Sequence, residues 1–206
     1  LLSIYPLYTL NIEVERNKPL IHKSITDWVK KNEKSAGFPF VTASSLYATE
    51  RNGTEALKQL QQMIRKQVLC NSMTKTDNYT PGLAGAQAIL NMLTQSWNGI
   101  IRIFPAIPPE WQNIAFYHLR TEGAFLISAQ KVNGKTTFVE VTNTAGELCT
   151  IELDFDNPTF DTSRRIRITR IGDRTYNIPI RKGESVRIYP RKSQPDFEIH
   201  AIGNNM

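Results

Sequence analysis

The pattern of hydrophobic and polar positions changes near residue 105. Before that point apolar residues recur three and four positions apart, which is the spacing of an amphipathic helix. We expect four helices, over about Pro19–Glu33, Val41–Glu50, Thr54–Leu69 and Pro81–Trp97. After that point apolar and polar residues alternate, which is typical of β-strands. The pattern therefore predicts an α+β protein, with helices first and an antiparallel β-sandwich after them.

The stretch from Thr80 to Trp111 joins the two halves. Thr80 is a favourable helix N-cap, and Pro81 suits the first helical turn. The helix that follows is rich in glycine and alanine and carries an apolar stripe, so we expect neighbours on most of its sides. Asn98-Gly99 is expected to end it as a C-cap. A short buried strand over 100–104 should then run to Pro105.

Strands are expected at regular intervals beyond Pro105, a spacing that favours an antiparallel sandwich. Asn133-Gly134 and Gly172-Asp173 are typical of the tight turns in β-hairpins. The expected strands are Phe116–Arg120, Phe125–Lys131, Thr136–Thr142, Leu148–Leu153, Arg165–Arg170, Arg174–Ile178, Ser185–Tyr189 and Phe197–Ala201. We place the domain boundary between a helical portion, residues 1–105, and a β-domain, residues 106–206.

Charge and composition narrow the classes of partner. No apolar run approaches the roughly 20 residues of a membrane span, so no membrane partner is expected. The formal charge of +6 is diffuse, with 12 Lys and Arg against 7 Asp and Glu up to Pro105, and 13 against 12 after it. A nucleic-acid partner is therefore not expected. The arginine-rich run 164–174 is interpreted as a solvated strand face, with a site for acidic polymers as the alternative.

Reactive side chains are few. Cys70 and Cys149 are each interpreted as small buried apolar residues. The three histidines, His22, His118 and His200, are widely spaced, so neither a metal site nor a cofactor is expected. The chain begins with Leu1 and has no basic leader, which suggests a piece of a longer protein.

Three motifs in order along the chain resemble a known family. They are Ile4-Tyr5-Pro6-Leu7-Tyr8, then Thr94-Gln95-Ser96 followed by Phe104-Pro105-Ala106-Ile107-Pro108, and finally Leu119 to Phe125. Together they resemble the end of the catalytic domain in glycoside hydrolase family 95, the α-L-fucosidases. The resemblance implies that the helices are the last ones of an (α/α)6 barrel. It also implies a carbohydrate partner and a periplasmic or extracellular location.

The resemblance also points to site residues. The family's general acid, a Glu, would lie upstream of Leu1, and its catalytic base, an Asp, aligns with Thr80. Asp77 is then the nearest substitute base. Ser3 stands where the family has a His, and Ser3 and Asn78 are candidates for contacts with substrate. The simpler structural interpretation makes Asp77 and Asn78 turn residues and Thr80 an N-cap.

Other side chains that could contact a sugar are interpreted structurally. Trp97 and Trp111 are expected in the core, and Glu110 and Glu122 are expected to be exposed charges rather than acids. The resulting hypothesis is a C-terminal fragment of a polysaccharide-degrading glycoside hydrolase that is inactive alone, since inverting hydrolysis needs two carboxyl groups across the sugar. A non-catalytic carbohydrate-binding or scaffolding module is the alternative. Self-association through the helical face is also expected, because cut helices would expose apolar surface.

Overall fold

The computed structural model describes residues 1–32, 37–75, 80–191, 193, 195–197 and 199. The chain forms two compact units. The helical unit contains Leu1–Thr94 and Pro105–Pro108, and the β unit contains Gln95–Phe104 and the chain from Pro109 onward. The boundary expected at residue 105 is therefore not a simple cut. Residues 95–104 pair with strands of the β unit, whereas Pro105–Pro108 return to the helices.

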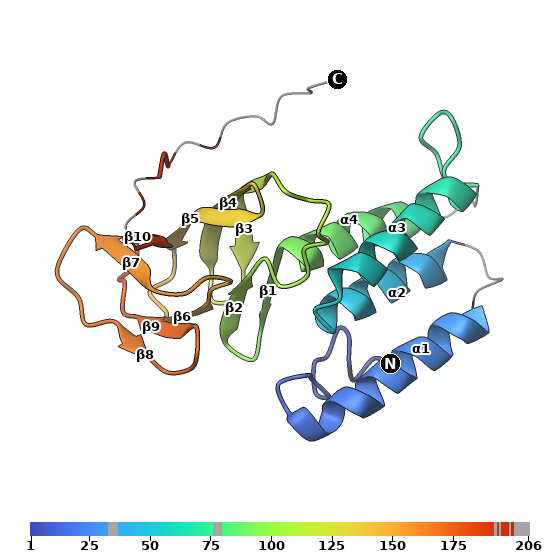
Figure 1. The fold of residues 1–206 in the computed structure, drawn as a ribbon, viewed down its shortest axis with the longest axis horizontal. Coiled ribbons are helices and arrows are strands. Elements are labelled where there is room, and N and C mark those ends of the chain that lie inside the picture. Colours follow the sequence, from blue (N-terminus) through green and yellow to red (C-terminus); the bar gives the residue numbers. More distant parts are fainter. Residues whose placement is uncertain (33–36, 76–79, 192, 194, 198, 200–206) are drawn as a thin grey trace. The chain divides into compact units, whose positions relative to one another are not determined.

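The helical unit contains a 3-10 turn η1, Glu15–Asn17, and four helices: α1 Lys18–Asn32, α2 Phe38–Thr49, α3 Gly53–Gln67 and α4 Thr80–Leu93 (Figure 1). Helix α3 begins at Gly53, one residue before the expected start at Thr54. Its N-cap is Asn52, whose side chain accepts a hydrogen bond from the Glu55 N–H at 3.1 Å. Gly53 follows it, and a Cβ there would lie 2.4 Å from the Ala106 carbonyl oxygen. A side chain at this position would clash, so glycine allows the Pro105–Pro108 segment to lie close to the start of α3.

Helix α2, not α4, is the central helix of the unit. It contacts α1, α3 and α4, and nine of its residues are buried. The expectation that α4 is covered on most sides is wrong, since Leu83 is 72% exposed and Ala86, Ile89 and Leu90 are also exposed. The small residues of α4 do permit close packing on one face: a Cβ on Gly85 would lie 3.0 Å from the methyl of Met63 in α3.

The expected end of α4 is also wrong. The helix stops at Leu93, and Thr94–Trp97 form strand β1, which pairs with β2, Ile100–Ile103. Asn98 and Gly99 have φ values of 56° and 71°. Two successive residues with positive φ between paired strands are typical of a type I′ hairpin turn. The Asn-Gly pair thus makes a hairpin rather than a helix C-cap, and a strand replaces the last helical turn.

The β unit consists of two five-stranded sheets, with orders β1-β2-β6-β9-β8 and β3-β4-β5-β10-β7 (Figure 1). The remaining strands are β3 Ile114–Thr121, β4 Phe125–Val132, β5 Lys135–Asn143, β6 Cys149–Glu152, β7 Pro158–Thr162, β8 Thr169–Arg170, β9 Thr175–Ile178 and β10 Ser185–Pro190. Both sheets are mainly antiparallel, as expected. The exception is β2, which runs parallel to β6 with Ile101 opposite Ile151. The α+β class is confirmed.

The core of the β unit is formed by the inward-facing side chains, which alternate with outward-facing ones along the strands. Val139 and Val141 of β5 and Val186 and Ile188 of β10 are fully buried in one sheet. Ile151 and Ile178 are fully buried in the other. Phe160 of β7 and Tyr176 of β9 join the two sheets by an edge-to-face contact, with ring centroids 5.2 Å apart.

The expected strand positions differ from the structure in three places. Strand β7 was not expected, and only Thr169–Arg170 of the expected strand 165–170 is a strand. The expected alternation nevertheless holds there, with Ile166 and Ile168 half-buried and Arg165 and Arg167 exposed. The expected strand 197–201 lies mostly outside the described residues, and Phe197 is not in a strand.

Candidate functional sites

The site residues expected from the sequence all fall in the helical unit. Ser3 is exposed, and its carbonyl accepts hydrogen bonds from the Leu10 N–H at 2.8 Å and the Thr9 hydroxyl at 3.3 Å. Thr80 is the exposed first residue of α4. Asp77 and Asn78 lie outside the described residues. The proposed roles of all four therefore stay predictions.

The start of α4 lies beside the start of α2. A Cβ on Gly37, directly before α2, would lie 3.2 Å from Cγ of Pro81. Gly37 has a φ of 33°, in the region that favours glycine, so the chain can turn there without a side chain in the way. Thr80 thus stands where two helix N-termini come together, and N-termini favour negative charge.

A groove of about 300 Å³ runs over α2 between α1 and α3. Aromatic rings, amides and lysines line it, including Trp28, Phe40, Tyr47, Gln59, Gln62 and Lys66. The Lys66 ammonium lies 4.8 Å from the centroid of the Phe40 ring, a cation–π contact. Burial, together with the nearby Glu55 and Glu50 carboxylates, raises the pKa of Tyr47. Its hydroxyl therefore remains a hydrogen-bond donor at neutral pH, and the groove suits binding rather than proton abstraction.

A second hollow, of about 490 Å³, contains an acid–base pair that the sequence did not reveal. His22 of α1 and Glu50, directly after α2, are 28 residues apart, and His22 Nδ1 lies 2.7 Å from Glu50 Oε1. The Glu50 side chain is mostly buried and that of His22 mostly exposed. The carboxylate orients the imidazole through Nδ1, and the ring itself is largely exposed to solvent. No sequence motif links the two residues, so only their contact identifies the pair.

Neither of these two hollows brings the carboxyl groups of two described residues together. Among the described residues, Glu55 is the one acidic residue that lines the α1–α3 groove, and Glu50 is the one that lines the His22 hollow. Glycoside hydrolysis with inversion needs an acid and a base on opposite faces of the sugar. These two hollows therefore offer binding surfaces and a single oriented imidazole, not a hydrolytic pair.

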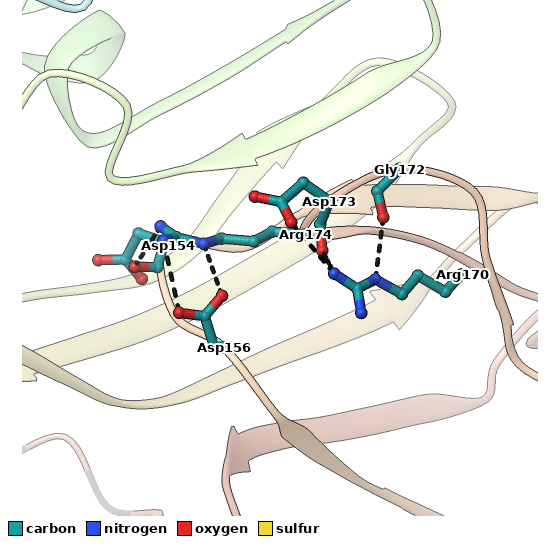
Figure 2. A network of polar contacts seen from close by, with 6 residues as sticks. All are labelled: Asp154, Asp156, Arg170, Gly172, Asp173 and Arg174. Atoms are coloured by element: carbon teal, nitrogen blue, oxygen red, sulfur yellow. Dashed lines mark hydrogen bonds and ion pairs between the residues drawn. The ribbon is translucent and has the colours of Figure 1, made fainter.

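The arginine-rich run is largely neutralised by carboxylates, as Figure 2 shows for two of its members. Arg174 pairs with Asp156 at 2.9 Å and reaches the Asp154 carbonyl at 3.4 Å, while Arg170 pairs with Asp173 at 3.2 Å. These contacts fasten the loop after β6 to the β8–β9 hairpin. They support the interpretation as a solvated face rather than a site for polyanions.

A third arginine of the run forms a further ion pair. Arg164 Nε lies 2.8 Å from Glu184 Oε1. The hydrogen bond from Arg164, together with one from the Arg181 N–H, lowers the pKa of Glu184. Arg165 and Arg167 are the exposed members that carry positive charge without a described ion pair.

The tryptophan and cysteine expectations can be compared with their burial. Trp97 is 2% exposed, so its place in the core is confirmed, and the Arg102 guanidinium stacks 3.6 Å from its ring centroid. Cys149 is fully buried, and burial raises the pKa of its thiol to about 12. The expectation for Cys70 is wrong, because this thiol is exposed just beyond α3.

The helices among the described residues are too short or too polar to cross a lipid bilayer.

Comparison with known proteins finds a similarity for the β unit. Residues 95–188 match the family model described as "Glycoside hydrolase family 95, C-terminal domain". The match begins at the first residue of the β unit and ends in β10. No curated protein matches the chain. The resemblance inferred from the motifs is thereby confirmed for this stretch: residues 95–188 are similar to the C-terminal domain of glycoside hydrolase family 95.

Proposed function

We propose that this chain is the C-terminal part of a polysaccharide-degrading glycoside hydrolase of the α-L-fucosidase type. The observation that carries the proposal is the match of residues 95–188, which covers the strands of the β unit almost completely. A C-terminal domain of a glycoside hydrolase suggests interaction with carbohydrate. The helical unit before it would supply the last helices of an (α/α)6 barrel, and the protein would work in the periplasm or outside the cell.

By itself the chain should not hydrolyse glycosides. One described acidic residue lines each of the two helical hollows above, and Thr80 stands where the resemblance places the base. A threonine hydroxyl is not a base near neutral pH. General acid and general base catalysis are each typically worth roughly 10²–10⁴-fold, so loss of both leaves no measurable rate. A non-catalytic carbohydrate-binding or scaffolding module is the alternative, favoured because only one described acidic residue lines each of these two helical hollows.

Two assays test this proposal. The purified chain, incubated with 2′-fucosyllactose, should release no fucose above a buffer blank, and it should migrate more slowly in native gels that contain a soluble polysaccharide. Release of fucose that disappears in Asp77→Asn would contradict the inactivity and identify Asp77 as the base. Migration that is unchanged across neutral and acidic polysaccharides would contradict the role in carbohydrate binding.

Self-association through α4 is the remaining part of the proposal. Leu83, Ala86 and Leu90 lie on one side of this helix and are exposed. Exposed apolar patches mark interaction surfaces in soluble proteins. We expect a second copy of the chain to cover this surface, so that sedimentation velocity shows a dimer at micromolar concentration. A strictly monomeric chain at 100 μM would show that α4 needs no cover.

A further inference from the structure

A hollow of about 410 Å³ lies in the β unit, and no described residue that was expected as a site from the sequence lines it. It opens where the β1–β2 hairpin, the β3–β4 turn and the segment before β6 meet. Ser96, Ile100, Glu122, Glu147, Leu148 and Thr150 are among the residues that line it. Its volume is within the range of roughly 300–1,000 Å³ that small-molecule sites occupy.

The turn that carries Glu122 is held in one conformation. Gly123 and Ala124 have φ values of 76° and 60°, so the β3–β4 turn is of the tight type with two left-handed residues. The Glu122 N–H donates to the Ser96 hydroxyl at 3.0 Å, which fastens this turn to β1. A Cβ on Gly123 would lie 2.7 Å from the Phe125 ring, so the turn packs closely on the core.

The turn that carries Glu147 is held more firmly still. Asn143 is fully buried, and its side-chain amide donates to the Glu147 carbonyl at 2.7 Å. Its side-chain oxygen accepts from the Gly146 N–H at 2.7 Å. The Thr144 N–H donates to the Ala124 carbonyl at 3.1 Å, which joins this turn to the one before β4. Both carboxylates are therefore presented by turns that are bonded to each other.

The side chains that line the hollow can still form hydrogen bonds and apolar contacts with a ligand. Neither Glu122 nor Glu147 makes an ion pair with another described residue, whereas four other carboxylates of this unit pair with arginines, namely those of Glu140, Glu152, Asp156 and Glu184. Thr150 donates its hydroxyl to Asn177 at 2.8 Å and can still accept. Leu148 is 56% exposed, and with the half-buried Ile100 it gives the hollow an apolar surface.

From this arrangement we infer that the hollow is a non-catalytic binding site for one neutral sugar residue of a saccharide. Carboxylates accept hydrogen bonds from sugar hydroxyls, and such charge-assisted bonds are the strong ones. The aliphatic side chains suit the C–H face of the ring. Two unpaired carboxylates repel uronates and sulfated sugars, so acidic saccharides are excluded. This inference rests on the proposed function, since it gives the carbohydrate a place on the chain.

The experiment is a titration of the ¹⁵N-labelled chain, followed by backbone amide shifts. The probes are methyl glycosides of galactose, fucose, glucose, mannose and xylose, with galacturonate and galactosamine as the acidic and basic comparisons. At least one neutral glycoside should shift the amides of Gly99, Gly123 and Gly146, and galacturonate should not. The double change Glu122→Gln with Glu147→Gln should weaken binding roughly tenfold or more. Glu110→Gln, an exposed carboxylate elsewhere in the unit, should leave it unchanged.

Several results would overturn the inference. One is the absence of shifts with all five neutral glycosides, and another is equal affinity in the Glu122 and Glu147 variant. Binding of galactosamine alone would show a site for cations instead. Shifts confined to the groove residues Gln59 and Gln62 would place the sugar on the helical unit. If the chain is slowed in polysaccharide gels but these shifts are missing, the proposed function stands and the inferred site fails.

Discussion

Asn143 should be among the most important single side chains for the stability of the β unit. It is fully buried at the end of β5, and its side chain makes four hydrogen bonds. The amide group donates to the carbonyls of Glu147 and Ile180 at 2.7 and 2.9 Å. The side-chain oxygen accepts from the N–H groups of Ala145 and Gly146 at 3.2 and 2.7 Å. One residue thus fastens two separate loops to the sheet.

The cost of Asn143→Ala follows from how buried each of these bonds is. The bond to Ile180 is fully buried, so its carbonyl would lose its partner without access to water, at about 2 kcal/mol. The other three bonds are partly buried, and their groups can be rehydrated, which reduces each loss to about 0.5–1 kcal/mol. The total is about 4 kcal/mol. For a unit of this size that lowers the melting temperature by roughly 15–25 °C.

Asn143→Asp is the sharper test. It keeps the volume and can keep the oxygen that accepts from Ala145 and Gly146, but it replaces the donor that serves two carbonyls with a second acceptor. We expect it to destabilise at least as much as alanine does, because a buried charge without a partner is costly. Asn177→Ala is the matched control, since the Asn177 side-chain oxygen accepts one half-buried bond from Thr150 at 2.8 Å and should cost about 1 kcal/mol.

Urea unfolding, monitored through the hydrogen exchange of the backbone amides of β5 and β10, measures the change in the free energy of unfolding of the β unit in each variant. A loss below 1 kcal/mol in Asn143→Ala, or wild-type stability in Asn143→Asp, would refute the reasoning. Either result would mean that water replaces the side chain without penalty.

Three further predictions use other residues. At pH 8 one thiol per chain, Cys70, should react with a maleimide, and Cys149 should react only after unfolding. Burial raises the pKa of Cys149 to about 12, so the free energy of unfolding should also fall as the pH rises from the ordinary thiol pKa towards 12. Cys149→Ala should remove that loss. Arg102→Met should cost about 2–4 kcal/mol in urea unfolding, because the buried guanidinium donates to the Trp97 and Ile100 carbonyls at 3.1 and 2.9 Å; an unchanged midpoint would contradict this. Leu83→Lys should leave stability within about 0.5 kcal/mol and reduce dimer formation in sedimentation velocity, whereas a large loss of stability would show that Leu83 is covered.

Much of the candidate chemistry could not be read from the sequence because it depends on contacts between distant residues. His22 and Glu50 meet only because α1 lies along α2. Glu122 looked like a plain exposed charge, and it becomes part of a hollow only when its turn is bonded to that of Glu147 through Thr144 and Ala124. The motifs, by contrast, suggested the resemblance that the family model shows for residues 95–188, and they did so without any contact.

The sequence by itself determined that helices come first and strands follow, and which side chains of a strand point inward. These properties follow from local periodicity, and even the irregular segment around Ile166 and Ile168 keeps its alternation. The Asn-Gly pair at 133–134 was likewise sufficient for a hairpin, with φ values of 50° and 71°. At 98–99 the same pair was taken for a helix end, because left-handed residues serve both structures.

Only the tertiary structure decided which of these local preferences prevailed. Strand β2 can pair with both β1 and β6, and these pairings favour strand over another helical turn after Leu93. Helices α2 and α4 are similarly apolar, yet three helices cover α2 and leave Leu83 of α4 in solvent. Burial depends on which surfaces meet, and surfaces far apart in the sequence meet only when the whole chain folds, so no local pattern specifies it.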